Sequence, residues 1–211
     1  MPISRAPVTA PRKAPKQARS AHLVDAIVQA AIRVLSKEGA HAFTTIRVAT
    51  VAGISVGSLY QYFPNKESIL FRLQQDEWAA TGNLIDTILT DEGLPATTRL
   101  RKAIRAFFRT EFDEAPLRRA LGSAASAYRD APQAKEQRLR GLPILLGVLD
   151  EAAPGLTPRH RNTAASLYIA TLTSLGEHTS ETQQTAAQVD RWAQTTADMY
   201  LAYLATLTRR C

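Results

Sequence analysis

The chain has 211 residues, 45% of them hydrophobic and 21% charged, which suits one or two packed domains and argues against a wholly disordered protein. It contains no run of about 18 uncharged apolar residues, so no membrane-spanning helix is expected. The basic first 20 residues lack an apolar core and contain four prolines, which argues against a secretory signal and against a transit peptide. The single cysteine, Cys211, leaves no partner for an intramolecular disulfide and fits a reducing compartment. We therefore expect a cytoplasmic protein.

The positive charge is concentrated in the first third of the chain. Residues 1–66 hold nine lysines and arginines against two acids, whereas the remainder holds 17 residues of each sign. The whole formal charge of +7 therefore belongs to a segment suited to a polyanion, followed by a neutral domain. Residues 1–19 carry five of the basic residues and are interpreted as a disordered basic arm, although a solubilising tail is an alternative for such a run.

The folded region opens with a clear helical pattern. Apolar residues recur at helical spacing from Leu23 to Leu35, with polar residues on the opposite face. Ser20 is the expected N-cap of this helix, and Gly39 is the expected stop.

Two short helices are predicted next, over residues 46–52 and 56–62, joined by a turn at Gly53. The candidate N-caps are hydroxyl residues in front of each helix: Thr44 or Thr45, and Ser55. Pro64 ends the second short helix.

The pattern stays helical to the end of the chain. Asn65 can cap a long helix that reaches Ile88, and Thr157 with Pro158 marks the start of another. Further apolar stripes predict helices over residues 100–112, 117–128, 133–151 with a kink at Gly141 and Pro143, 164–175 and 189–207. With no credible sheet, the sequence predicts an all-α fold of about nine helices. Its expected domains are residues 20–64, with three helices, and residues 65–211.

The two short helices have the form of a helix-turn-helix, whose second helix enters the major groove of DNA. Small residues at the start of this helix would allow close approach, while hydroxyl and amide groups could reach phosphates and base edges. The spacing turns Leu59 and Phe63 inward, with Ile54 as the anchor of the pair. A helical hairpin without a role in DNA binding is the alternative. The charge asymmetry favours DNA binding.

A rival motif overlaps this one. Gly53, Ser55 and Gly57 match the GxSxG nucleophile elbow of α/β-hydrolases, and the preceding TTIRVATV is rich in β-branched residues. Such an elbow needs a strand before the serine and βα units after it, whereas the rest of the chain shows helical periods. A small hydrolase using Ser55 is therefore the alternative function. The histidines are scattered singly, so no metal site and no cofactor are expected.

Aromatic and aliphatic side chains of the C-terminal region could line a small-molecule cavity, although stripes at helical spacing are more often ordinary core. The candidate pocket residues are Trp78, Phe107, Phe108, Phe112, Leu121, Tyr128, Leu145 and Tyr168. Trp192, Tyr200 and Tyr203 on the last helix could pack internally or across a dimer interface, where aromatic residues are enriched. The sequence alone does not separate these alternatives.

Residues 43–70, FTTIRVATVAGISVGSLYQYFPNKESIL, resemble the DNA-binding signature of the TetR family of bacterial transcriptional regulators. The matching features are a threonine-rich entry, AGIS at the turn, and the residues Gly57, Leu59, Tyr60, Tyr62, Phe63, Asn65, Lys66 and Glu67. The resemblance implies a homodimeric repressor rather than an enzyme, bound to a palindromic operator in double-stranded DNA and released by a small-molecule inducer. The neutral C-terminal domain with its aromatic stripes indicates that this inducer is largely apolar. It also implies a dimer interface on the helices near residues 164–175 and 189–207.

The resemblance also assigns DNA contacts. Phosphates would be held by Thr45, Ser55, Ser58, Tyr60, Tyr62 and Lys66, and base edges would be met by Val56, Gly57 and Gln61. Family members often have lysine where this chain has Val56, which leaves that position open to a contact with a thymine methyl. The family also often has charged residues where this chain has Thr50 and Val51.

Overall fold

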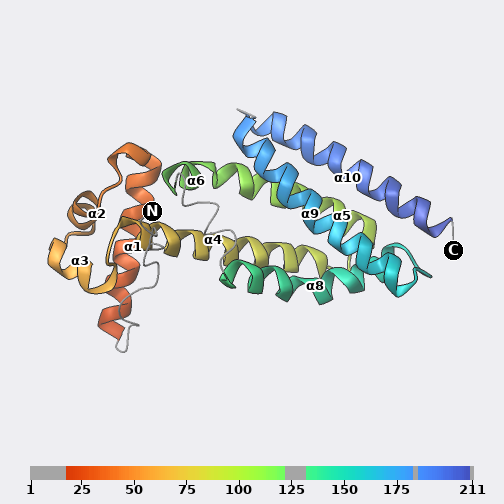
Figure 1. Cartoon of the computed structure of the whole chain (residues 1–211), viewed down its shortest axis with the longest axis horizontal. Coiled ribbons are helices and arrows are strands. Elements are labelled where there is room, and N and C mark those ends of the chain that lie inside the picture. The colour runs from red at the N-terminus through yellow and green to blue at the C-terminus, as the bar shows by residue number, and fades with distance from the viewer. Residues whose placement is uncertain (1–17, 122–131, 183–184, 210–211) are drawn as a thin grey trace, which may run out of the picture. The chain divides into compact units, whose positions relative to one another are not determined.

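The computed structural model describes residues 18–121, 132–182 and 185–209, and every regular element in these ranges is helical (Figure 1). The elements are α1 (Ala18–Glu38), the 3₁₀ turn η1 (Ala40–Ala42), α2 (Thr45–Ala52), α3 (Val56–Tyr62), α4 (Lys66–Leu89), α5 (Ala96–Asp113), α6 (Ala115–Leu121), α8 (Pro132–Ala152), α9 (Pro158–Thr182) and α10 (Ala186–Thr208). The predicted all-α class is confirmed. None of the described helices is long and apolar enough to cross a bilayer.

The helices divide into two compact units. The first unit contains α1, α2, α3, the first half of α4 up to Glu77, and α6 from Pro116 onward. The second contains α4 from Trp78 onward, with α5, α8, α9 and α10. The predicted domain boundary between residues 64 and 65 stays a prediction. Residues 1–17 of the expected arm lie outside the described residues.

Helix α1 supplies much of the core of the first unit. Its apolar stripe is buried, with Ile27 and Val34 fully inaccessible to solvent. The expected N-cap at Ser20 is wrong, because the helix already includes Ala18 and Arg19, both good helix formers. The stop at Gly39 is confirmed: this residue has a φ of 80°, a conformation that suits glycine, and its N–H donates to the carbonyl of Leu35 at 3.2 Å.

The caps of α2 and α3 agree with the sequence pattern. Thr44 accepts a hydrogen bond from the N–H of Arg47 at 3.1 Å, and Ser55 accepts one from the N–H of Ser58 at 3.0 Å. Gly53 ends α2 in the left-handed conformation, with φ 70° and ψ 30°. The segment TTIRVATV is therefore helical from Thr45 onward, because β-branching lowers helix propensity only slightly while the caps at both ends favour the helix.

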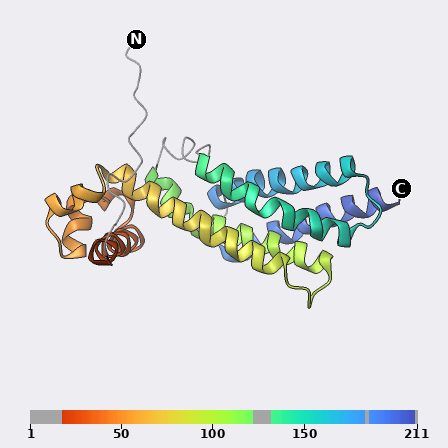
Figure 2. The same ribbon diagram turned by 90° about the horizontal axis from the view of Figure 1, so that it is seen from below.

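The second unit is a helical bundle in which α5 packs against both α9 and α10 (Figure 2). Tyr168 of α9 and Tyr200 of α10 meet edge to face inside it, with ring centroids 4.9 Å apart. Their hydroxyl groups donate to the carbonyls of Leu100 at 3.2 Å and Ala164 at 2.9 Å, so both buried hydroxyls are satisfied. Burial raises the pKa of each tyrosine well above its ordinary value, and both rings remain neutral.

Three further expected helices can be compared with the structure. The stretch from 133 to 151 lies in the single helix α8, with Pro143 inside it. The stretch from 117 to 128 is described as helix only to Leu121. Thr157 and Pro158 are confirmed as the start of α9, because Thr157 accepts a hydrogen bond from the N–H of His160 at 3.3 Å.

Candidate nucleic-acid interface

Helix α3, the second helix of the predicted helix-turn-helix and called the recognition helix below, has a buried side and an exposed side. Leu59 is fully buried and Phe63, just after the helix, is almost fully buried, as their spacing predicts. The opposite side presents Gly57, Tyr60 and Gln61, all of them exposed. A helix anchored on one side and free on the other can be laid into a groove of DNA without loss of its core contacts.

Hydroxyl groups connect α2 to α3 and organise the turn between them. The hydroxyls of Thr45 and Tyr60 lie 3.2 Å apart, so the first residue of α2 is hydrogen-bonded to an exposed tyrosine of α3. The hydroxyls of Ser55 and Ser58 lie 2.8 Å apart at the start of α3. Four residues expected to contact DNA are therefore brought together as two hydroxyl pairs.

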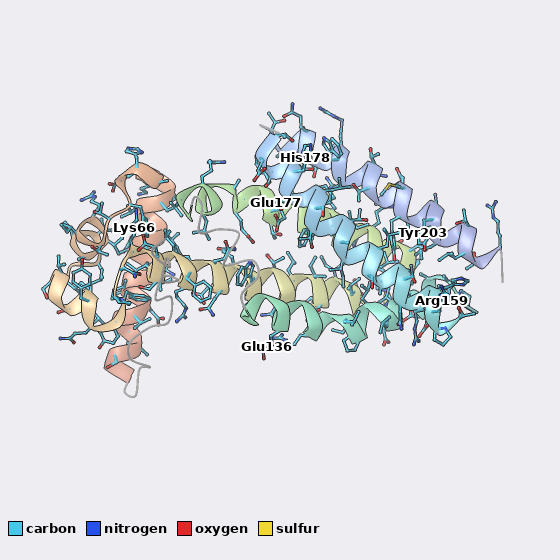
Figure 3. All side chains as sticks on the ribbon, viewed as in Figure 1. Lys66, Glu136, Arg159, Glu177, His178 and Tyr203 are labelled. Atoms are coloured by element: carbon cyan, nitrogen blue, oxygen red, sulfur yellow. The ribbon has the colours of Figure 1, made fainter. Side chains whose placement is uncertain are left out.

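Two further predicted phosphate contacts differ in their surroundings. Lys66 is exposed at the first position of α4, and Figure 3 labels it there. The N–H of Ser68 donates to Oδ1 of Asn65 at 2.8 Å, which confirms the predicted cap of this helix. Tyr62, by contrast, is only 8% exposed and belongs first to the core of the unit. A phosphate contact from Tyr62 would be limited to the small part of its side chain that reaches solvent.

An ion pair that was not predicted from the sequence joins α1 to α2. Arg47 of α2 donates from Nε and Nη2 to the two carboxylate oxygens of Glu38 on α1, both at 2.8 Å. This bidentate contact lowers the pKa of Glu38 and raises that of Arg47. Spacing could not reveal the pair, because the two residues belong to different helices. Ile46, immediately before Arg47, is another missed surface residue, with 64% of its area exposed.

The surroundings of Ser55 do not form a nucleophile elbow. Among the described residues no strand precedes this serine, and α2 occupies that place. Its hydroxyl caps α3 and is hydrogen-bonded to the hydroxyl of Ser58. The GxSxG match therefore reflects the turn of a helix-turn-helix.

The residues expected around a ligand lie mainly in the core of the second unit. Phe108, Leu145 and Tyr168 are buried in one apolar cluster. Phe107 and Phe112 are partly buried against the same cluster. These side chains therefore belong to the packed interior, as the commoner interpretation of such stripes holds.

The three remaining pocket candidates are Trp78, Leu121 and Tyr128. Trp78 is partly buried at the start of the second unit. The side chain of Leu121 and the whole of Tyr128 lie outside the described residues. A ligand-binding role for any of these residues stays a prediction.

A helix-turn-helix unit attached to a separate helical bundle defines a class of DNA-binding regulators. Comparison with models of protein families places the chain in such a class. The model described as bacterial regulatory proteins, tetR family, matches residues 27–73, and the model of the tetracyclin repressor-like C-terminal domain matches residues 95–207, more than half of the chain. The chain belongs to the TetR family and is a transcriptional regulator.

One relative is the fatty acid metabolism regulator protein of Bacillus subtilis (strain 168), 32% identical over 78 residues. This alignment covers 37% of the chain and only 39% of the relative, so the chain spans about two fifths of the relative's length. The structure of FadR from Bacillus subtilis in complex with stearoyl-CoA is similar, with a TM-score of 0.59 and 19% identity over 84% of this chain and 97% of that one.

The structure of AlkX from Dietzia sp. strain DQ12-45-1b, a TetR family repressor implicated in biodegradation of n-alkanes, is also similar. Its TM-score is 0.56, with 19% identity over 93% of this chain and 100% of that one. At these identities the likeness establishes the shared fold.

Proposed function

We propose that the protein represses transcription as a homodimer that places its two copies of α3 in successive major grooves of a palindromic operator. The observation that carries the proposal is the division of α3 into a buried side, anchored by Leu59, and a free side that presents Gly57 and Gln61. The excess of positive charge in residues 1–66 supplies the attraction to the DNA backbone.

The proposed contacts follow the chemistry of each side chain. Thr45, Ser55, Ser58, Tyr60 and Lys66, with the accessible part of Tyr62, would hold phosphates and fix the position of the helix. Val56 and Gly57 at the start of α3, with Gln61 on its free side, would meet base edges. The basic residues of 1–19 would add contacts without sequence preference.

The dimer interface is proposed on α9 and α10. Their sides that carry Tyr168 and Tyr200 are buried in the chain's own core, so the interface would use the outward sides. Leu167 of α9 and Trp192 and Met199 of α10 are exposed there. The ring of His178, labelled in Figure 3, meets Trp192 edge to face with centroids 6.0 Å apart. An exposed aromatic and two exposed aliphatic side chains suit the apolar centre of a two-fold interface.

The inducer is proposed to be a small, largely apolar molecule bound in the second unit. The apolar cluster around Phe108 supplies suitable side chains, and the relatives that bind stearoyl-CoA or act in fatty acid and alkane metabolism favour an aliphatic chain. Helix α4 begins in the first unit and ends in the second, so its displacement would carry the signal. A ligand acts only through its different affinities for the two states.

Selection from a pool of random DNA duplexes tests the DNA-binding part. The purified full chain should enrich a two-fold symmetric sequence and bind it as a dimer, by light scattering of the complex. Lys66→Ala should weaken this binding, whereas Lys102→Ala should not, because Lys102 is an exposed lysine of α5 in the other unit. Recovery of no preferred sequence, or binding by a monomer, would contradict the proposal.

A further inference from the structure

The first turn of α2 carries an unusually exposed apolar side chain. Ile46 is 64% exposed, the highest value among the large apolar side chains of the described residues. A single exposed isoleucine on a protein surface needs no explanation by itself. Ile46, however, lies in the first turn of α2, which is hydrogen-bonded to the recognition helix through Thr45 and Tyr60.

The contacts of its neighbours define the surface around Ile46. Val48 and Ala49 face the core, and Arg47 is drawn away by its two hydrogen bonds to Glu38. Thr50, one turn after Ile46, is exposed but donates its hydroxyl to the Ile46 carbonyl at 2.9 Å. The free side of α2 therefore presents an aliphatic group, and the side chains of Arg47 and Thr50 are already engaged in hydrogen bonds of their own.

This surface adjoins the free side of α3. Thr45, the residue before Ile46, lies with its hydroxyl 3.2 Å from that of Tyr60, which is itself 41% exposed. The hydrogen bond holds the first turn of α2 beside the exposed part of the recognition helix. Ile46 follows Thr45 in this turn and its side chain is exposed, so when α3 lies in a major groove, position 46 lies near the same stretch of DNA.

An isoleucine cannot hold a phosphate, because it has no hydrogen-bond donor and no charge. In the major groove the one apolar feature of a base pair is the C5-methyl group of thymine. We infer that Ile46 is a specificity-determining residue that contacts a thymine methyl in each half-site. The inference rests on the proposed binding of α3 in the major groove, and it extends base readout from α3 to α2.

The test replaces single thymines by uracil in the selected operator, since uracil lacks only the methyl group. Wild-type protein should lose about fourfold in affinity at one thymine position when it is changed in one half-site, the loss expected for one buried methyl-sized group. Ile46→Ala should bind the thymine and uracil forms of that position equally. Dissociation constants measured by fluorescence anisotropy at one fixed salt concentration give the comparison.

Two control variants separate this contact from others. Val56→Ala should keep the uracil effect at the position assigned to Ile46, because Val56 would meet a different base. Ile32→Ala removes another exposed isoleucine, 41% accessible on α1, and should keep every uracil effect. Thermal unfolding of each variant checks that the fold is retained, and Ile46→Val, which keeps part of the side chain, should show an intermediate uracil effect.

The outcomes are distinct. The inference is overturned if Ile46→Ala keeps every loss of affinity caused by uracil, or if no thymine in the selected operator shows such a loss in the wild type. The proposed function would still stand in either case. A change in oligomeric state of Ile46→Ala with unchanged uracil effects assigns Ile46 to a protein contact and also overturns it. Failure of the wild-type protein to select any sequence would overturn the proposed function together with the inference.

Discussion

Arg109 of α5 and Asp190 of α10 form a bidentate ion pair, with Nε to Oδ1 at 2.8 Å and Nη2 to Oδ2 at 2.6 Å. Arg105, one turn before Arg109, donates to the same carboxylate at 3.1 Å. One carboxylate thus joins two turns of α5 to α10. The hydrogen bonds from Arg109, with those from Arg105, lower the pKa of Asp190 from 3.8 to about 2.

The hydrogen bonds that lower the pKa of Asp190 stabilise the folded state at neutral pH, where this carboxylate is ionised. The contribution of Asp190 is fully present above about pH 4 and is lost as the pH falls toward 2, because the unfolded chain binds the proton first. Asp190→Asn should lower the free energy of unfolding at pH 7 by about 1 kcal/mol, a modest value because both guanidinium groups are partly solvated.

Urea unfolding at pH 7 and at pH 2.5 measures this effect. The difference between wild type and Asp190→Asn should shrink at the lower pH. Asp198→Asn is the matched control, since Asp198 also pairs with α5 through Arg101 but is more exposed, and its effect should be smaller. An equal difference at both pH values would show that the charge of Asp190 does not matter.

Local signals explain which parts of the fold were predictable. The caps at Thr44 and Ser55 and the left-handed turn at Gly53 depend on residues within one turn, so the sequence shows them directly. The capping box of α10, formed by Thr185 and Gln188, is equally local and was overlooked although its spacing is a known signature.

Other features depend on residues distant in sequence. The pair of Arg109 and Asp190 spans 81 positions, and no pattern in one sequence indicates it. The spacing predicted the burial of Leu59 and Phe63, but Tyr62 was assigned to DNA by family resemblance, although it lies three residues after Leu59 and therefore shares its side of the helix. Resemblance indicates where a family places a role, whereas burial depends on packing in this particular chain.

Gly176 of α9 marks a close approach to α5. A Cβ atom at this position would lie 2.9 Å from Cε1 of Phe107, a ring packed against the core of the second unit. Gly176→Ala should therefore cost about 1–3 kcal/mol through overpacking. Gly147→Ala in α8 is the control, because nothing lies within 4 Å of its Cβ position, and it should stabilise by about 0.5–1 kcal/mol. Thermal unfolding of the two variants should give shifts of opposite sign, and a stabilised Gly176→Ala would show that the ring moves aside freely.

Glu38 engages the exposed guanidinium of Arg47 in two hydrogen bonds near the proposed DNA surface. Glu38→Gln should release this guanidinium, raise affinity for all DNA sequences and steepen the dependence of log affinity on log salt by up to about 0.9, the value of one neutralised phosphate. Asp25→Asn is the matched control, because it removes an exposed acid of the same helix while leaving the pair of Glu38 and Arg47 intact. Equal salt slopes for the two variants would show that Arg47 is too far from the phosphates to act.

Gln61 and Lys66 should differ in the kind of binding that they support. Gln61→Ala should relax base preference at one position of each half-site, at a cost of about 1–3 kcal/mol. Lys66→Ala should weaken all sequences almost equally, because phosphates carry no sequence information. Binding to a set of single-base operator variants measures both effects, and a uniform loss for Gln61→Ala would remove it from the base-reading residues.

Ligand and operator should weaken each other by the same factor if the proposed induction is correct. Palindromic operators require half-sites spaced by about one helical turn or a multiple of it, so a small displacement of the recognition helices is costly. A coupling of about 1–3 kcal/mol corresponds to a loss of roughly 5- to 150-fold in DNA affinity. Stearoyl-CoA and free stearate, used below their aggregation limits, are suitable first probes because one similar structure contains stearoyl-CoA.

Calorimetric titration of the protein with the probe, with and without operator duplex, measures how far the operator changes the affinity for the probe. Titration with operator, with and without the probe, measures how far the probe changes the affinity for the operator. Thermodynamic reciprocity requires the two factors to agree. Phe108→Ala, which opens the apolar cluster of the second unit, should change the affinity for the probe while leaving the base preference of the operator unchanged. A probe that binds equally well in the presence and absence of operator would contradict release by that ligand, however tightly it binds, because equal affinity for two states shifts neither.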